Sequence, residues 1–236
     1  MNPTSQGPGA KVATEAAQPY KERLKHLAHA ALEPLTAALA RLGVGPDGVT
    51  IMGLMVSLVA ALAFFEGYFR FGAAMVALSG VCDILDGELA RRSNHRSRFG
   101  AFLDSTLDRV SEGALYVGLA YYYFTRSSTA TVWLRGSFEG SSQWGDADGA
   151  TLGILSLAIL ILSFLVSYTR ARAEGLGMEC KVGIMERPER FLTLGVGALL
   201  GHRFMPGVLG VLFILTLVTV LQRVYHVRKL TQTNSA

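Results

Sequence analysis

The sequence predicts an all-α, polytopic membrane protein with six transmembrane helices, preceded by an amphipathic helix at the membrane surface. Half of its 236 residues are hydrophobic and only 17% are charged, whereas a soluble domain carries about 25% charged residues. The mean hydropathy is +0.35. The uncharged stretches 149–169 and 205–222 approach the roughly 20 residues that cross a bilayer. A large soluble helical bundle is the alternative to a membrane domain.

Two segments precede the first predicted crossing. Residues 1–19 are polar and lack the apolar core of a signal peptide, so we expect a disordered tail there. Across residues 20–43, leucines recur at helical spacing and most lysines and arginines fall between them. A helix of this kind can lie in the membrane interface. The turn-forming residues Gly43 to Gly48 then end it.

The rest of the chain predicts one membrane domain over residues 44–230, with a short tail at 231–236. Its apolar stretches are separated by tight connections at 67–70 and 203–204 and by a long Gly- and Ser-rich loop at 127–150. The fifth stretch is the shortest. The predicted crossings are 49–66, 71–92, 100–126, 149–173, 187–202 and 205–227.

Lysine and arginine are distributed unevenly along this layout. With both ends cytoplasmic, the inner segments hold 17 of the 22 Lys and Arg residues, and the outer connections hold four. Because these residues concentrate on the cytoplasmic side, the pattern predicts an even number of crossings in the cell membrane with both termini inside. The net charge of +4 then reflects topology and anionic ligands, and we expect no nucleic-acid partner.

Two cysteines, Cys82 and Cys180, are present. They form no disulfide framework. Neither belongs to a cluster of cysteine and histidine, so we expect no zinc site.

Four aspartates lie in the second and third predicted crossings, where a lipid-facing helix carries no charge. Asp83 and Asp86 are three residues apart, and Asp104 and Asp108 are four apart, so each pair shares one helix face. The short loop between the two crossings makes them antiparallel neighbours. We therefore expect the two pairs to face each other in one cluster near the cytoplasmic side.

Such a cluster has a limited number of chemical uses. Carboxylates in a poorly solvated site repel one another, so they take up protons or bind cations. Oxygen ligands favour the hard ions Mg²⁺ or Mn²⁺ over zinc, and four carboxylates can hold two ions. An ion or proton transporter and structural pairing of single aspartates are the alternatives. Charges concentrated at the inner ends of the crossings disfavour a path through the whole membrane.

The aspartates belong to a longer pattern that resembles the signature of the CDP-alcohol phosphotransferases. The pattern is Asp83-x2-Asp86-Gly87-x2-Ala90-Arg91-x8-Gly100-x3-Asp104-x3-Asp108. It covers 26 residues with every fixed position present, and the six-crossing layout extends the likeness over residues 20–230. The resemblance implies a homodimeric enzyme that transfers the phosphate-linked part of a CDP-linked lipid to an alcohol and releases CMP.

The resemblance also implies roles for residues of the site. Asp83, Asp86 and Asp104 match metal ligands, and Asp108 matches both a metal ligand and the general base. The positions that match contacts to the CDP-linked lipid are Pro46, Asp47, Gly48, Val49, Thr50, Gly87, Arg91 and Ser97. Without the resemblance, Pro46 to Gly48 predict only a turn before a helix. The glycines of the pattern would then allow close helix packing, and Arg91 would mark a cytoplasmic loop.

Two further runs lie at the inner ends of the fourth and fifth crossings, Ser167-Tyr-Thr-Arg170 and Glu186-Arg-Pro-Glu-Arg190. Guanidinium groups there suit an acceptor alcohol that itself carries a phosphate. The runs resemble those of prokaryotic phosphatidylinositol-phosphate synthases, although Arg170 stands where a lysine is expected. The resemblance implies acceptor-phosphate contacts at Ser167, Arg170 and Arg190, and Arg223 is a further candidate. The alternative explanation is that these arginines flank the cytoplasmic ends of the crossings or form ion pairs at helix ends.

The resemblance thus predicts transfer of the phosphatidyl group from CDP-diacylglycerol to inositol 1-phosphate, which forms phosphatidylinositol phosphate in phospholipid biosynthesis. The expected cofactor is Mg²⁺, or Mn²⁺ in its place, as a pair of ions. Glycerol 3-phosphate, which is also anionic, is the first alternative acceptor, and serine is the next. A catalytically silent membrane scaffold is a further alternative.

Overall fold

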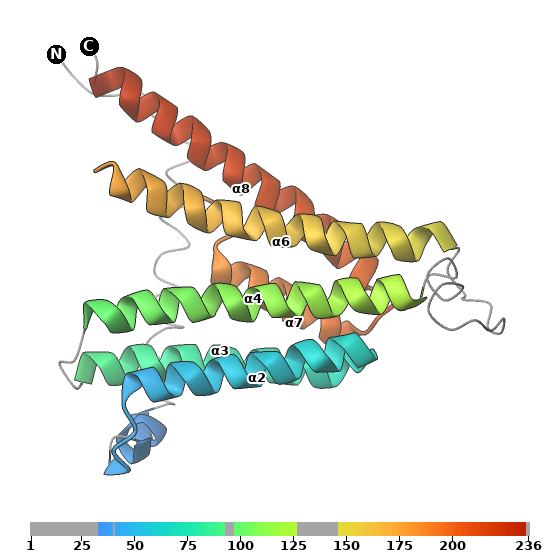
Figure 1. The fold of residues 1–236 in the computed structure, drawn as a ribbon, viewed down its shortest axis with the longest axis horizontal. Helices are drawn as coiled ribbons and strands as arrows, with labels where there is room; N and C mark the ends of the chain where they lie inside the picture. Colours follow the sequence, from blue (N-terminus) through green and yellow to red (C-terminus); the bar gives the residue numbers. More distant parts are fainter. Residues whose placement is uncertain (1–32, 40, 93–96, 127–145, 235–236) are drawn as a thin grey trace, which may run out of the picture.

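The computed structural model describes residues 33–39, 41–92, 97–126 and 146–234, and these residues confirm the all-α prediction (Figure 1). Turns and one longer connection, residues 176–186, join the helices. The helices are α2 (Pro46–Glu66), α3 (Phe69–Arg92), α4 (Arg98–Arg126), α6 (Asp146–Gly175), α7 (Arg187–Leu200) and α8 (Met205–Asn234).

Glycine and proline fix the ends of two of these helices. Pro46 opens α2, where its missing N–H costs no hydrogen bond, and Gly67 ends α2 at a φ of 86°. A residue with a side chain adopts this left-handed conformation only with strain. The chain therefore reverses within two residues and starts α3. Gly201, which follows α7, also has a positive φ of 98°, but its ψ of 173° lies outside the left-handed helical region.

The helices alternate in direction along the bundle (Figure 1). The chain starts α2 and ends α8 at the same end of the bundle. The second half of α3 and the first half of α4 therefore lie at this end as well. The predicted aspartate pairs and the arginine-rich runs also lie toward this end of the bundle. We call it the acidic end.

Among the described residues, three helices have the length and composition of a membrane span: Pro46–Glu66, Gly149–Gly175 and Met205–Gln232. For α3, α4 and α7, a complete crossing stays a prediction. α7 has 14 residues and is therefore about 21 Å long, shorter than the roughly 30 Å hydrocarbon core. The fifth predicted crossing is thus the shortest of the six, and it stays a prediction.

The segments outside the predicted crossings are only partly described. The tail at 1–19 lies outside the described residues, and so does most of the predicted amphipathic helix at 20–43, of which residues 33–39 are helical. Most of the long loop at 127–150 also lies outside them. At the other end, α8 is helical to Asn234, past residue 230 where we expected the membrane domain to end.

The packing of α3 and α4 differs from the prediction. The two helices run antiparallel, but they make little direct contact, because α2 packs against both of them and α7 packs against α3. Small residues allow this: a Cβ at Gly118 of α4 would lie 2.4 Å from the Ala61 carbonyl oxygen of α2. A Cβ at Gly53 would lie 3.1 Å from that of Cys82. The aspartate pairs therefore border a space between α3 and α4 instead of a tight helix contact.

Apolar side chains fill the other half of the bundle and also cover its outside. The core cluster includes the buried residues Phe64, Tyr116 and Ile159. Large apolar residues such as Phe102, Val117 and Ile161 are nevertheless more than half exposed. Exposed apolar surface on several helices is typical of a protein that faces lipid.

Candidate active site

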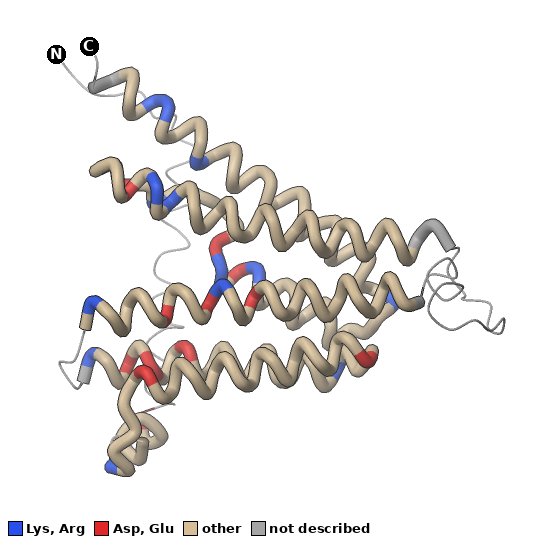
Figure 2. The backbone as a smooth tube through the Cα atoms, in the orientation of Figure 1, with Lys and Arg blue, Asp and Glu red and all other residues tan. Residues whose placement is uncertain are grey.

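Charged positions gather toward the acidic end of the bundle (Figure 2). The four predicted aspartates lie there on α3 and α4, and α6, α7 and α8 bring arginines to the same end. These five helices converge although their charged residues are up to 140 positions apart in the sequence. The following geometry determines what this end can bind.

Arg187, the first residue of α7, connects the two acidic helices. Its Nη1 lies 2.5 Å from Oδ2 of Asp83, and its Nη2 lies 2.9 Å from Oδ1 of Asp108. The guanidinium group stacks over the ring of Phe191, 4.6 Å from the ring centroid. Because one planar group contacts both carboxylates, Asp83 and Asp108 face a common space, as the sequence predicted for the two pairs.

The other two aspartates extend this cluster. The charge of Asp104 acts on Asp83, Asp86 and Asp108, so the carboxylates interact as one group. Asp86 is buried and accepts a hydrogen bond from Thr50 Oγ1 at 2.9 Å. This bond joins α2 to the acidic part of α3.

The donor set of this cluster fits a hard divalent cation. It consists of carboxylate oxygens only, from two helices that border one space, and Mg²⁺ and Mn²⁺ prefer such ligands. Among the described residues, no group of three or more Asp, Glu, His or Cys side chains is arranged to hold one ion in the present conformation. Arg187 lies between two of the four aspartates, and its charge offsets their repulsion. The residues therefore fit a metal, provided that Arg187 gives way.

The predicted contacts to the CDP part lie around the same space. A Cβ at Gly100 would lie 3.0 Å from Asp47 Oδ1, so the first turn of α2 lies close to the start of α4. Ser97 Oγ accepts a hydrogen bond from the Gly100 N–H at 2.7 Å and thus caps α4. At Gly87 a Cβ would meet no atom within 4 Å, so there is open space beside Asp86. The structure thus brings these predicted positions close to the cluster.

Two of the predicted acceptor contacts meet at Glu186, the residue before Arg187. Arg223 Nη2 lies 3.1 Å and Arg170 Nη1 3.8 Å from Glu186 Oε1. Arg223 also donates to the carbonyl oxygen of Val182. Ser167 is half-buried one turn before Arg170. Arg170 and Arg223 are therefore close to the aspartate cluster, because the residue that follows Glu186 is Arg187, which contacts the aspartates.

Arg190, the third predicted acceptor arginine, has a different environment. Its side chain is 1% exposed, and its Nε and Nη2 donate to the two carboxylate oxygens of Glu112 at 2.6 and 2.8 Å. Its Nη1 donates to the carbonyl oxygen of Met185 at 2.8 Å. All three nitrogens are used, so Arg190 would reach an acceptor only by giving up one of these bonds. Its position in this structure links α7 to α4 through a buried ion pair.

Sequence reasoning missed two residues of this site, Arg187 and Glu112. A signal was present in the spacing: Arg187 and Arg190 are three apart on α7, and Asp108 and Glu112 are four apart on α4. Residues at these spacings share a helix face, so two arginines of one helix match two acids of the other. Only the packing of α7 beside α4 shows that the two faces meet.

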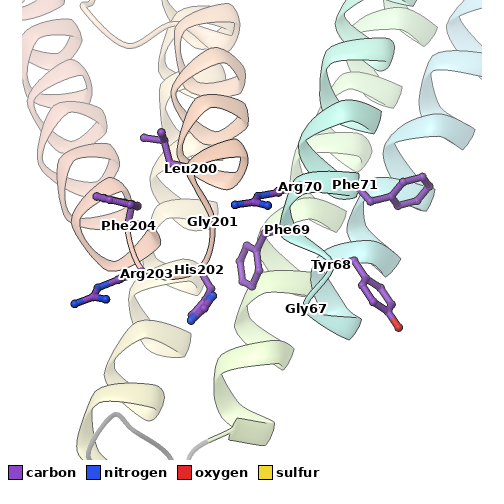
Figure 3. Close-up of a pocket in the computed structure, with 10 residues that line it drawn as sticks. All are labelled: Gly67, Tyr68, Phe69, Arg70, Phe71, Leu200, Gly201, His202, Arg203 and Phe204. Atoms are coloured by element: carbon purple, nitrogen blue, oxygen red, sulfur yellow. The ribbon is translucent and has the colours of Figure 1, made fainter.

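A separate pocket of about 460 Å³ lies at the opposite end of the bundle (Figure 3). It is lined by the turns that join α2 to α3 and α7 to α8, and its basic residues are Arg70, His202 and Arg203. Its lining includes no carboxylate. It therefore cannot provide the carboxylate metal ligands that the sequence predicts.

Comparisons with known proteins agree with this geometry. Residues 44–222 match the protein family described as CDP-alcohol phosphatidyltransferase. The chain is 37% identical over 201 residues to a phosphatidylinositol phosphate synthase of Mycobacteroides abscessus, with 83% of this chain and 82% of that protein covered. It is also 37% identical over 191 residues to an archaetidylinositol phosphate synthase of Methanothermobacter thermautotrophicus, with 79% and 85% covered.

Solved structures give the same result. The phosphatidylinositol phosphate synthase of Mycobacterium tuberculosis, crystallised with CDP-DAG bound, has a TM-score of 0.67 and 31% sequence identity, with 82% of this chain and 92% of that chain covered. A structure of that synthase in complex with manganese and citrate also has a TM-score of 0.67, with 32% identity and 82% and 87% coverage.

Proposed function

This chain belongs to the CDP-alcohol phosphatidyltransferase family, and on this premise we propose that it transfers the phosphatidyl group of CDP-diacylglycerol to inositol 1-phosphate. The products are phosphatidylinositol phosphate and CMP. The observation that carries the proposal is the meeting of two sites through two adjacent residues, Glu186 and Arg187, at the start of α7. Arg187 contacts the aspartates of the family signature, and Glu186 contacts the arginines that suit a phosphorylated acceptor.

The aspartate cluster is the proposed reaction centre. Divalent ions held by Asp83, Asp86, Asp104 and Asp108 would neutralise the diphosphate and stabilise the leaving CMP. Asp108 accepts the proton of the acceptor hydroxyl, whose oxygen forms a bond to the lipid-side phosphorus. The bond from that phosphorus to the oxygen of CMP breaks. Arg187 lies beside this cluster at the start of α7, and its guanidinium is a proposed contact for phosphate oxygens.

The nucleotide part is proposed to lie against the segment from Pro46 to Thr50. This segment borders both acidic helices, since Thr50 bonds to Asp86 and Asp47 touches the position of Gly100. The open space beside Gly87 gives a diphosphate access to the carboxylates. Arg91 and Ser97 lie at the adjacent ends of α3 and α4 and complete the proposed set.

The acceptor phosphate is proposed to bind Ser167, Arg170 and Arg223. Glu186 now pairs with both arginines, and a phosphate dianion would compete with it for the same donors. The names of both compared relatives contain inositol phosphate while their lipid parts differ, which favours inositol phosphate as the acceptor of this chain. Arg190 is not required for this pocket.

We place the acidic end at the cytoplasmic face of the cell membrane, from the bias of lysine and arginine toward it. Water-soluble inositol phosphate and CMP can enter and leave at such a boundary. The acyl chains of the lipid substrate stay among the exposed apolar residues of the helices. A homodimer is proposed from the family resemblance.

The test is an assay of purified protein with CDP-diacylglycerol and Mg²⁺ that measures CMP release. Inositol 1-phosphate, inositol, glycerol 3-phosphate and serine are offered separately and then in competition. We expect release with inositol 1-phosphate and little with inositol, because only the former brings a phosphate to the arginines. A preference for glycerol 3-phosphate would correct the acceptor, and no CMP with any acceptor would reject the enzyme.

A further inference from the structure

Arg187 forms ion pairs with Asp83 and Asp108, two of the carboxylates that the proposed metal site needs. We propose that Arg187 is a built-in counter-cation of the aspartate cluster, which a divalent ion displaces from Asp83 and Asp108 when it binds. This inference rests on the proposed metal site and adds a competing role for a residue of this chain.

The contacts of Arg187 are those of a charge that offsets repulsion. One guanidinium reaches carboxylates on two different helices, at 2.5 and 2.9 Å, with a side chain that is only 21% exposed. The charge of Asp104 acts on both carboxylates as well. Without a cation, four carboxylates around one space would repel strongly. In the metal-free protein, Arg187 supplies part of the missing positive charge.

A divalent ion and Arg187 compete because both are positive and need the same oxygens. An ion bound by Asp83 and Asp108 would lie within a few Å of the guanidinium, at a distance where like charges repel strongly in a partly buried site. The present conformation agrees with this competition: within the described ranges no three acidic, His or Cys side chains are arranged around one ion. The ligand set can close on a metal once Arg187 has moved.

The surroundings of Arg187 allow its side chain to move while the backbone stays. One turn further along α7, Arg190 is fixed to α4 by its buried bonds to Glu112. Among the described residues, the guanidinium of Arg187 contacts the two carboxylates and stacks on Phe191. Its Nε is buried and has no hydrogen-bond partner among the described residues. A displaced Arg187 therefore has a free donor for a phosphate oxygen.

Mn²⁺ binding to the purified full chain, without nucleotide, tests this inference. The electron paramagnetic resonance signal of free Mn²⁺ gives the dissociation constant. We expect Arg187→Gln to bind Mn²⁺ about tenfold more tightly than the wild type, which corresponds to about 1.4 kcal/mol. Arg187→Lys keeps the charge but cannot bridge two carboxylates, so its affinity should lie between the two. Arg172→Gln, at an exposed arginine of α6, is the matched control and should bind like the wild type.

Thermal unfolding provides a second measurement. With a chelator, Arg187→Gln should unfold at a lower temperature than the wild type, because its carboxylates lack a counter-charge. Added Mn²⁺ should raise the unfolding temperature of Arg187→Gln more than that of the wild type, since an ion that binds more tightly stabilises the folded state more.

The outcomes separate the inference from the metal site. If the wild type binds Mn²⁺ and Arg187→Gln and Arg187→Lys bind it equally or more weakly, Arg187 does not compete and the inference is wrong. If neither the wild type nor the variants bind Mn²⁺, the metal site itself is wrong and the inference falls with it. If Arg187→Gln fails to fold, the affinity of Arg187→Lys decides.

Discussion

At the residue scale, Asp108 has the most specific of the proposed chemical roles. Its contact with Arg187 places it at the border of the space between α3 and α4. We predict that Asp108→Asn lowers turnover by about 10²- to 10⁴-fold, the usual contribution of a general base, while CDP-diacylglycerol still binds. CMP release and a lipid-binding assay measure the two effects.

The control for this variant is Thr106→Ala. Thr106 lies two residues before Asp108 and bonds only to the backbone oxygen of Phe102 in the same helix. It should retain near wild-type turnover. Turnover retained in Asp108→Asn would remove the carboxylate from the role of base.

The pair of Glu112 and Arg190 is a second feature of single residues. Both side chains are at most 2% exposed, and removing one member leaves a buried charge without a partner. We predict that Arg190→Ala and Glu112→Ala each lower the free energy of unfolding by about 3–5 kcal/mol. Thermal unfolding in detergent measures the loss.

Glu174→Ala serves as the control for this pair. It breaks an exposed ion pair with Arg170, so its effect on stability should stay within about 1 kcal/mol. The assigned packing role is contradicted if Arg190→Ala keeps the wild-type unfolding temperature and raises only the KM for the acceptor. That result would return Arg190 to the acceptor pocket.

At the scale of elements, the close approach of α2 to α4 positions the space between the acidic helices. A Cβ at Gly118 would lie 2.4 Å from the Ala61 carbonyl oxygen, which is backbone and cannot move aside. We predict that Gly118→Ala destabilises the fold by about 1–3 kcal/mol and lowers turnover, because α4 must shift away from α2. Unfolding temperature and CMP release are measured together.

Gly80→Ala is the matched control, because a Cβ at this position of α3 would meet no atom within 4 Å. It should be neutral or stabilising by up to about 1 kcal/mol, since alanine favours the helix. Equal loss in both variants would mean that the contact at Gly118 is unimportant.

At the scale of the whole molecule, the proposed reaction depends on divalent cations bound by four aspartates of two helices. We predict that a chelator abolishes CMP release and that Mg²⁺ or Mn²⁺ restores it, whereas Zn²⁺ restores it poorly because it prefers nitrogen and sulfur ligands. Full activity after exhaustive chelation would contradict the metal-dependent reaction.

The sequence by itself determined the fold class, the positions of most helices and the identity of the acidic cluster. These follow from local properties. Apolar runs predict helices of membrane length, and spacings of three and four residues put Asp83 with Asp86 and Asp104 with Asp108. The distribution of lysine and arginine predicted that the four aspartates and the arginine runs lie on one side of the membrane. The alternating directions of the helices likewise bring them to one end of the bundle (Figure 1).

Only the tertiary structure decided how these parts meet. A short loop between α3 and α4 suggested direct packing, but the small residues of α2 let that helix contact both, and the acidic faces border a space instead. Arg187 and Glu112 became recognisable only when α7 lay beside α4. The physical reason is that helical spacing fixes which residues share a face, whereas the partner of that face depends on packing between segments distant in sequence.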